Sequence, residues 1–176
     1  MIKQRRNKQK GITIIEFTLI VLTVMLMLIG IIEIGRYVFS LQMMNEMTRK
    51  AARLATVCYV LDQNEIPTMD EVVENYPADF EAENLVIEYL DSSGTAVDLT
   101  NYGALSAEAQ GSLFATIRFV RARVINYQYQ FNGLLSFIGT SGLLTMPEFQ
   151  TTLPAESLGV VRPREDDDDS GVIIDC

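Results

Sequence analysis

The residue types in this sequence exclude several common kinds of catalytic site. The sequence has no histidine among its 176 residues, which excludes Ser-His-Asp and Cys-His catalysis and the common zinc sites with histidine ligands. We also find no glycine-rich phosphate-binding loop. The sequence therefore argues against an enzyme, and we expect no catalytic residues, no cofactor and no metal site.

Two cysteines, Cys58 and Cys176, could form a covalent cross-link. Both follow a long apolar segment, on the side of the membrane that we expect to be oxidising. An even number of cysteines in such a compartment permits one disulfide, although two isolated cysteines do not establish it. The pairing of Cys58 with Cys176 stays open at this point.

One carboxylate lies inside the apolar segment. Glu16 is the single formal charge from Ile12 to Ile32. As a helix with a rise of about 1.5 Å per residue, this segment would be about 31 Å long, close to the ~30 Å hydrocarbon core of a bilayer. It is longer than the ~7–15-residue apolar region of a signal peptide, so we expect a transmembrane helix.

The charges before the apolar segment are all positive. They predict a cytoplasmic N-terminus, with everything after Ile32 on the outer side. Removal of residues 1–11 would take away five of the 14 Lys and Arg residues and none of the 23 acidic residues, so the formal net charge would fall from −9 to −14. Because so acidic a chain binds nucleic acid poorly, we read the basic residues as a topology signal. They are Lys3, Arg5, Arg6, Lys8 and Lys10.

Two interpretations of Glu16 fit the sequence. A carboxylate at the centre of a membrane helix costs about 2.5–3.5 kcal/mol, but Glu16 is near the membrane edge and its carboxylate could extend to the cytoplasmic face. Alternatively, cleavage after Gly11 would make Ile12 a new N-terminus. The terminal amine of a neighbouring subunit would then be the positive partner of Glu16.

The basic leader, Gly11, the Glu16-Phe17 pair and the apolar run together resemble the type IV pilin and pseudopilin signal. The Glu-Phe pair is similar to that of the Tad (Flp) branch. Residues 30–57 resemble the TadE-like family of minor pilins, although Ala51 stands where the family usually has glycine. The residues that carry this second resemblance are Glu33, Gly35, Arg36, Arg49, Ala52, Arg53 and Ala55.

The resemblance implies a structural subunit, a minor pilin or pseudopilin, for assembly of a Tad-type pilus. It implies cleavage by a prepilin peptidase between Gly11 and Ile12, and assembly contacts at Glu16 and Phe17. The implied partners are other pilins, the inner-membrane assembly platform, the peptidase and the lipid bilayer. The chain would be a single-pass inner-membrane protein with a periplasmic C-terminal domain, or part of an extracellular pilus. A type II secretion-like pseudopilin and an uncleaved signal-anchored receptor or adhesin domain stay open as alternatives.

The position of the first proline and the changes in composition divide the chain into five predicted parts. Because no proline occurs between Ile12 and Pro67, we expect one helix from about Ile12 to Leu61. Its outer half carries an apolar stripe that would pack on the chain's own domain or on a partner helix. The stripe contains Tyr37, Leu41, Met44, Met47, Ala51, Leu54 and Cys58. The expected parts are a leader (1–11), a transmembrane helix (12–32), its amphipathic extension (33–61), an α+β domain (62–161) and an acidic, disordered tail (162–176).

Helix and turn signals continue the domain after the long helix. Thr68 and Glu71 fit a capping box that would begin a short helix ending before Pro77. Residues 84–90 read as a strand, with a turn that predicts a hairpin into residues 95–99. Residues 107–110 are weakly helical.

Two more strands are expected towards the C-terminus. Strict alternation makes residues 125–131 the strongest predicted strand. The apolar face changes parity between Val124 and Ile125, which predicts a β-bulge or a bend. Residues 148–153 would form the last strand. The fold class is therefore α+β, a long N-terminal transmembrane and amphipathic helix packed on a small antiparallel β-sheet domain, as in pilins.

Three smaller features complete the sequence interpretation. Arg118, Arg121 and Arg123 are expected to pair with carboxylates of their own domain. The apolar residues 134–138 would form a loop or short helix that caps the sheet, or would contact a partner or the membrane. The four aspartates at 166–169 lack an ordered ligand set for calcium.

Overall fold

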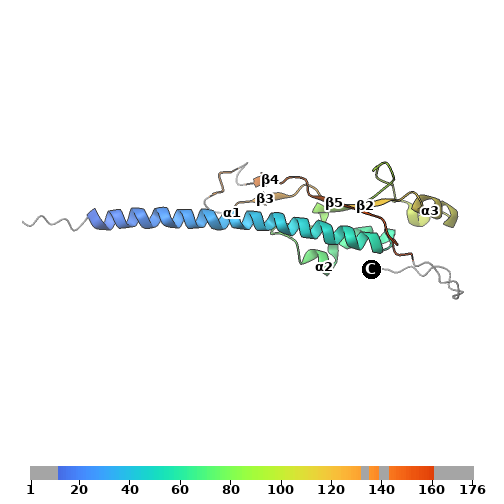
Figure 1. Ribbon diagram of the computed structural model, residues 1–176, viewed down its shortest axis with the longest axis horizontal. Helices are drawn as coiled ribbons and strands as arrows, with labels where there is room; N and C mark the ends of the chain where they lie inside the picture. Colours follow the sequence, from blue (N-terminus) through green and yellow to red (C-terminus); the bar gives the residue numbers. More distant parts are fainter. Residues whose placement is uncertain (1–11, 132–134, 139–142, 161–176) are drawn as a thin grey trace, which may run out of the picture. The chain divides into compact units, whose positions relative to one another are not determined.

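A computed structural model describes residues 12–131, 135–138 and 143–160 (Figure 1). The predicted leader with Gly11, the acidic tail with Cys176, and Gly133, Leu134 and Gly139 lie outside the described residues. The chain divides into two compact units, one of residues 1–38 with 130–144 and one of residues 39–129 with 145–176. Each unit is described by itself.

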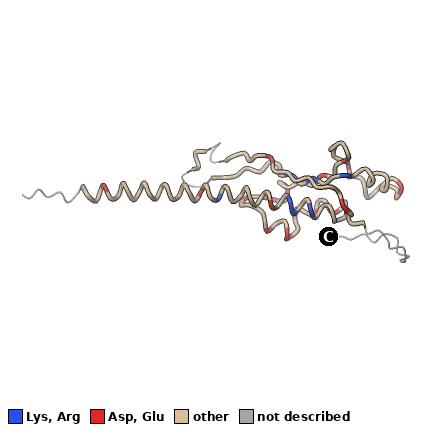
Figure 2. The backbone as a smooth tube through the Cα atoms, viewed as in Figure 1, with Lys and Arg blue, Asp and Glu red and all other residues tan. Residues whose placement is uncertain are grey.

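Helix α1 (Ile12–Val57) contributes to both units as one continuous helix of 46 residues. This confirms the predicted single helix, which ends four residues before the expected Leu61. At that end Tyr59 has extended backbone angles, and two short 3₁₀ turns follow, η1 (Val60–Asn64) and η2 (Ile66–Thr68). Figure 2 shows that charged residues are sparse along the first part of α1 and frequent further along it.

In the first unit, α1 carries large apolar side chains that the chain does not cover. The exposed fraction is 68 % for Phe17, 66 % for Met27 and 63 % for Ile32. By length and composition this helix can cross a membrane. The apolar residues of the first part of α1 therefore have the exposure that a lipid-facing helix requires.

The second unit is built on a three-stranded antiparallel sheet of order β1-β2-β5. Its strands are β1 (Leu85–Leu90), β2 (Phe119–Val124) and β5 (Gln150–Pro154). Val120 and Ala122 of β2 are fully buried on one face, while Arg121 and Arg123 point to the other. The sheet therefore has an apolar face for the core and a polar face, as the alternating sequence dictates.

Helix α1 supplies the other side of the core in this unit. Met44, Met47 and Ala51 have no exposed surface. The Tyr89 hydroxyl of β1 donates to the Ala55 carbonyl oxygen at 3.5 Å, and the hydroxyls of Thr151 and Thr48 are 3.1 Å apart. The predicted packing of the apolar stripe on the chain's own domain is confirmed here, and the α+β class with it.

Shorter elements connect the strands. Helix α2 (Asp70–Val73) follows η2, η3 (Ala82–Asn84) leads into β1, and η4 (Tyr102–Ala104) precedes α3 (Ala107–Phe114). Helix α3 is longer than the predicted 107–110, and Ser106 caps it by accepting a hydrogen bond from the Ala109 N–H at 3.4 Å.

The predicted capping box at Thr68 is wrong. The residue before α2 is Met69, which makes no side-chain cap, and the Thr68 hydroxyl donates instead to the Glu65 carbonyl oxygen at 2.7 Å. Pro67 is the second residue of the 3₁₀ turn η2, so Thr68 ends that turn and does not begin the next helix.

The predicted hairpin after β1 is present only as a short extension. Residues 95–99 do not form a strand, and a single bridge joins Leu90 to Ala96. The main partner of β1 is β2, more than 25 residues further along the chain, with Glu88 opposite Arg121. The local turn signal was real, because the Asp91 carboxylate accepts hydrogen bonds from the Ser93 and Thr95 N–H groups.

Residues 125–131 are not the strongest strand. Only β3 (Gln128–Gln130) forms a ladder there, with β4 (Leu143–Thr145), while the longer strand is β2 just upstream. Asn126 has a left-handed φ of 55°, which ends the ladder and makes the predicted change of parity a bend. Tyr127 and Tyr129 are buried as the alternation predicted.

Candidate assembly and membrane-contact site

The residues predicted to act in assembly lie on the apolar part of α1. Glu16 is exposed, and Phe17 next to it is 68 % exposed. Ile12 is the first helical residue, and Gly11 lies outside the described part of the chain. The structure thus places Glu16 and Phe17 on a helix surface that its own chain leaves open, where a second helix or lipid can reach them.

A second carboxylate lies where the apolar segment ends. Glu33 follows Ile32 directly, yet its exposed fraction is only 7 %. Its Oε2 atom accepts a hydrogen bond from the backbone N–H of Leu135 at 2.8 Å. Sequence reasoning named Glu33 as part of a family motif but missed this contact, because nothing local connects two residues that are 102 positions apart.

The segment around Leu135 does not cap the sheet as predicted. Phe137 is 76 % exposed and Ser136 is also exposed. One turn further along α1, the rings of Tyr37 and Phe131 pack with their centroids 5.6 Å apart. The segment is therefore held beside α1 with its aromatic side chain pointing outwards.

The basic motif residues of α1 border a groove in the second unit. Arg49 and Arg53 are exposed, and with Glu46, Lys50, Thr151 and Leu153 they line a groove of about 290 Å³. Lys50 also pairs with Glu74 at 2.9 Å. The hydrogen bond and the charge of Lys50 lower the pKa of the Glu74 carboxyl.

The three arginines of the sheet region divide into a pair and a single residue. Arg121 and Arg123 both bind Glu88, with Nε–Oε distances of 2.8 Å and 2.9 Å, as predicted; the ion pairs among the described residues do not include Arg118. Burial would raise the pKa of Glu88, but the hydrogen bonds from Arg123 and Arg121 outweigh it, so the pKa lies below its ordinary value of 4.5. This cluster stabilises the sheet.

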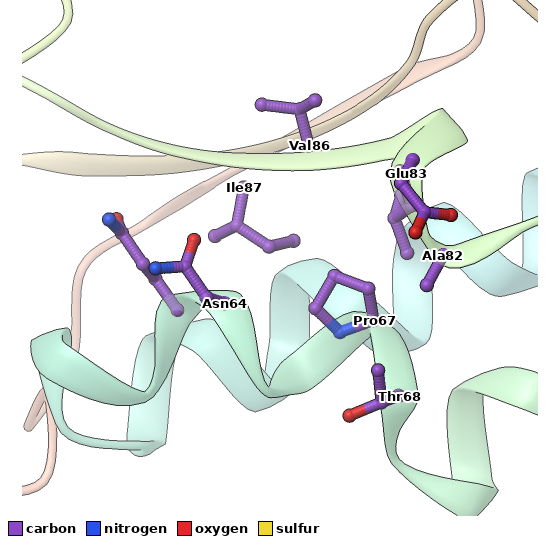
Figure 3. A pocket seen from close by; sticks show the side chains of 9 residues that line it. Asn64, Pro67, Thr68, Ala82, Glu83, Val86 and Ile87 are labelled. Atoms are coloured by element: carbon purple, nitrogen blue, oxygen red, sulfur yellow. The ribbon is translucent and has the colours of Figure 1, made fainter.

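A pocket of about 440 Å³ opens between β1, η2 and η3 in the second unit (Figure 3). Ile87 points towards Pro67, and Val86 points to the opposite side of the strand. Glu83 is the one titratable side chain among the residues that line it. A single carboxylate without a second acid, base or nucleophile beside it offers no arrangement for catalysis.

Cys58 is fully buried just after α1. The Leu158 N–H donates to the Thr56 carbonyl oxygen at 3.0 Å, so the chain returns to the end of α1 shortly before the tail begins. Cys176 lies outside the described residues, and its pairing with Cys58 stays a prediction. Among the residues that the structure describes, no group of three or more potential ligands is placed to hold a metal.

Comparison with known proteins finds a similarity in the N-terminal part of the chain. Residues 11–53 match the family model described as TadE-like protein. This confirms the predicted resemblance over a segment that contains Glu16, Glu33 and Arg49. The match covers 43 of the 176 residues of the chain. No curated protein and no solved structure matches the chain.

Proposed function

We propose that this TadE-like chain is a minor pilin or pseudopilin, a structural subunit that a prepilin peptidase processes between Gly11 and Ile12. In this proposal residues 12–32 anchor it in the inner membrane with the N-terminus in the cytoplasm. The domain after α1 lies in the periplasm. The mature chain then joins other pilins and the assembly platform of a Tad-type pilus.

The proposal rests on the difference in side-chain exposure between the two ends of α1. Its first part exposes large apolar side chains, 68 % of Ile14 and 63 % of Ile20, while Met44 and Met47 further along have no exposed surface. The exposed part requires lipid or other helices around it. A helix that anchors and assembles at one end and forms the core of its own domain at the other end is what a pilin subunit requires.

Glu16 supplies the assembly contact in this proposal. An ionised carboxylate among apolar side chains gains from a cationic partner, and cleavage after Gly11 creates an amine at Ile12. Within one helix the two groups are about one turn apart, and the amine is also engaged with the first turn of the helix. A neighbouring subunit that is staggered along the helix axis offers a better-directed amine.

The test is co-purification of the tagged chain with the other pilins of its system, with intact mass recorded in parallel. We expect Glu16→Ala and Glu16→Gln to retain expression, membrane insertion and cleavage but to lose most of the co-purifying pilins. Thr18→Ala is the matched control, because its hydroxyl donates to the Ile14 carbonyl oxygen of its own helix, at 2.8 Å.

Two outcomes would contradict the proposal at different levels. If Glu16→Ala assembles like the unchanged chain, the inter-subunit role of Glu16 is wrong and its carboxylate extends to the membrane surface instead. If the unchanged chain is cleaved by no peptidase and purifies with no pilin, the signal-anchored receptor or adhesin domain becomes the better interpretation.

A further inference from the structure

Phe131 and Leu135 contact α1 in the order opposite to the direction of the helix. Phe131 contacts Tyr37, and Leu135 contacts Glu33. Tyr37 comes four residues after Glu33 on α1, whereas its partner Phe131 comes four residues before Leu135. Four residues of helix rise about 6 Å, so the contact of Leu135 lies about one turn nearer to Ile32 and the apolar part of α1 than the contact of Phe131 does.

Glu33 determines where along the axis of α1 Leu135 lies. Its carboxylate is almost fully buried and accepts the Leu135 N–H at 2.8 Å. A buried carboxylate needs such donors, and a charge-assisted hydrogen bond is stronger than a neutral one. Since Glu33 follows directly on the apolar segment that ends at Ile32, Leu135 is held at the level where that segment ends.

Phe137 is two residues beyond this contact and is unusually exposed. Its exposed fraction of 76 % exceeds that of the large apolar side chains of α1, among them Ile31 at 60 % and Ile32 at 63 %. An exposed aromatic ring next to an exposed apolar helix surface marks a contact with another apolar phase. Phenylalanine is among the side chains that insert at the boundary between headgroups and acyl chains in interfacial segments.

We propose that Leu135–Ile138 form a membrane-contact loop, in which Phe137 inserts its ring into the outer leaflet and Glu33 sets its depth. The lipid surface is the occupant that the observations favour, because the loop is held at the end of the very segment that the bilayer would cover. The inference rests on the membrane-spanning role of α1 in the proposed function. It adds a second, shallow point of contact that orients the chain about the helix axis.

The absence of tryptophan from the sequence allows a direct test. The full-length Phe137→Trp chain is reconstituted in phosphatidylcholine vesicles whose acyl chains carry bromine either near the headgroup or near the terminal methyl. We expect strong fluorescence quenching by the shallow bromine and weak quenching by the deep bromine.

Two reporter variants separate the loop from the membrane span. Met25→Trp replaces a 55 % exposed side chain in the apolar segment, and we expect quenching by the deep bromine. Val73→Trp replaces a 42 % exposed side chain of the second unit, and we expect quenching by neither. If Met25→Trp is quenched and Phe137→Trp is not, the loop proposal is overturned while the span stands. If Met25→Trp is not quenched, the membrane-spanning role fails, and the loop proposal with it.

The depth-setting role of Glu33 has its own readout. Combined with Phe137→Trp, Glu33→Ala removes the acceptor for the Leu135 N–H, and we expect loss of most of the shallow quenching. Glu33→Gln keeps an acceptor oxygen and should restore it. Equal quenching in all three chains would overturn the role of Glu33. If the tryptophan of Phe137→Trp is buried only after pilin partners are added, and not by lipid alone, the loop contacts a protein and the lipid proposal is overturned.

Discussion

Glu88 of β1 lies directly opposite Arg121 of β2, and the same carboxylate also binds Arg123 two residues further along that strand. One carboxylate thus pairs with two guanidinium groups on the polar face of the sheet. The arrangement joins the two strands through side chains as well as through the backbone ladder.

Glu88→Gln should lower the stability of the domain by about 1–2 kcal/mol at neutral pH, because half-buried charge-assisted hydrogen bonds are lost. Thermal unfolding of the full-length chain in detergent, followed by the circular dichroism of its tyrosines, measures this. Glu74→Gln is the matched control. Its partner Lys50 is on the surface and the Glu74 side chain is 64 % exposed, so we expect a much smaller change.

The same pair predicts a pH dependence of defined sign. The pKa of Glu88 in the folded chain lies below its ordinary value of 4.5. Its contribution to stability is therefore fully present above that value and is lost as the pH falls through the lowered pKa. The stability difference between the unchanged chain and Glu88→Gln should shrink on acidification. A difference that is constant from neutral to acidic pH would contradict this assignment.

Gly159→Ala should destabilise the domain by at least about 2 kcal/mol. Gly159 has a φ of +74°, and an added Cβ would lie 2.6 Å from the backbone N and Cα of Tyr59. Gly94→Ala is the control, because Gly94 has a φ of +81° but open space around it. We expect it to cost about 1 kcal/mol, from the backbone alone. Equal unfolding temperatures for the two variants would show that the close approach to Tyr59 does not affect the stability of the domain.

We predict that Cys58 and Cys176 pair. The disulfide would close a loop of more than 100 residues and stabilise the fold by about 4–5 kcal/mol in the chain-entropy account. Thiol labelling under denaturing, non-reducing conditions should find no free thiol in protein from the periplasmic side of the membrane. Two labelled thiols per chain would rule the bond out.

We predict cleavage after Gly11. Glycine has no side chain, which suits close approach of a protease to the backbone. Intact mass of the membrane-extracted protein should show Ile12 as the first residue, and Gly11→Leu should keep the leader. An unchanged chain that still begins with the basic leader would support a signal anchor.

The sequence predicted the features that repeat along one element. The length of α1 and its buried face at Met44, Met47 and Ala51 follow from helical periodicity. The buried positions of Tyr127 and Tyr129 follow from alternation in the same way. In these cases the residues that decide the outcome are neighbours in the chain.

The errors arose where tertiary partners or single backbone angles decided the outcome. Asn126 adopts a left-handed φ that ended the expected strand, and alternation gives no sign of it. The strand order β1-β2-β5 and the contact of Glu33 with Leu135 both join residues that are far apart in the chain. No local pattern specifies such pairs, and Glu33 was visible beforehand only through its place in a motif.

The core of the domain joins the first element to be synthesised with the last. Met44 and Met47 emerge early, whereas β5, whose Thr151 reaches Thr48, emerges about 100 residues later. At about 5–20 residues per second the buried face of α1 waits roughly 5–20 s for its final partner strand. During that interval the part of α1 around Thr48 lacks this partner strand. A holding partner, or the membrane surface itself, would shield it until the domain closes.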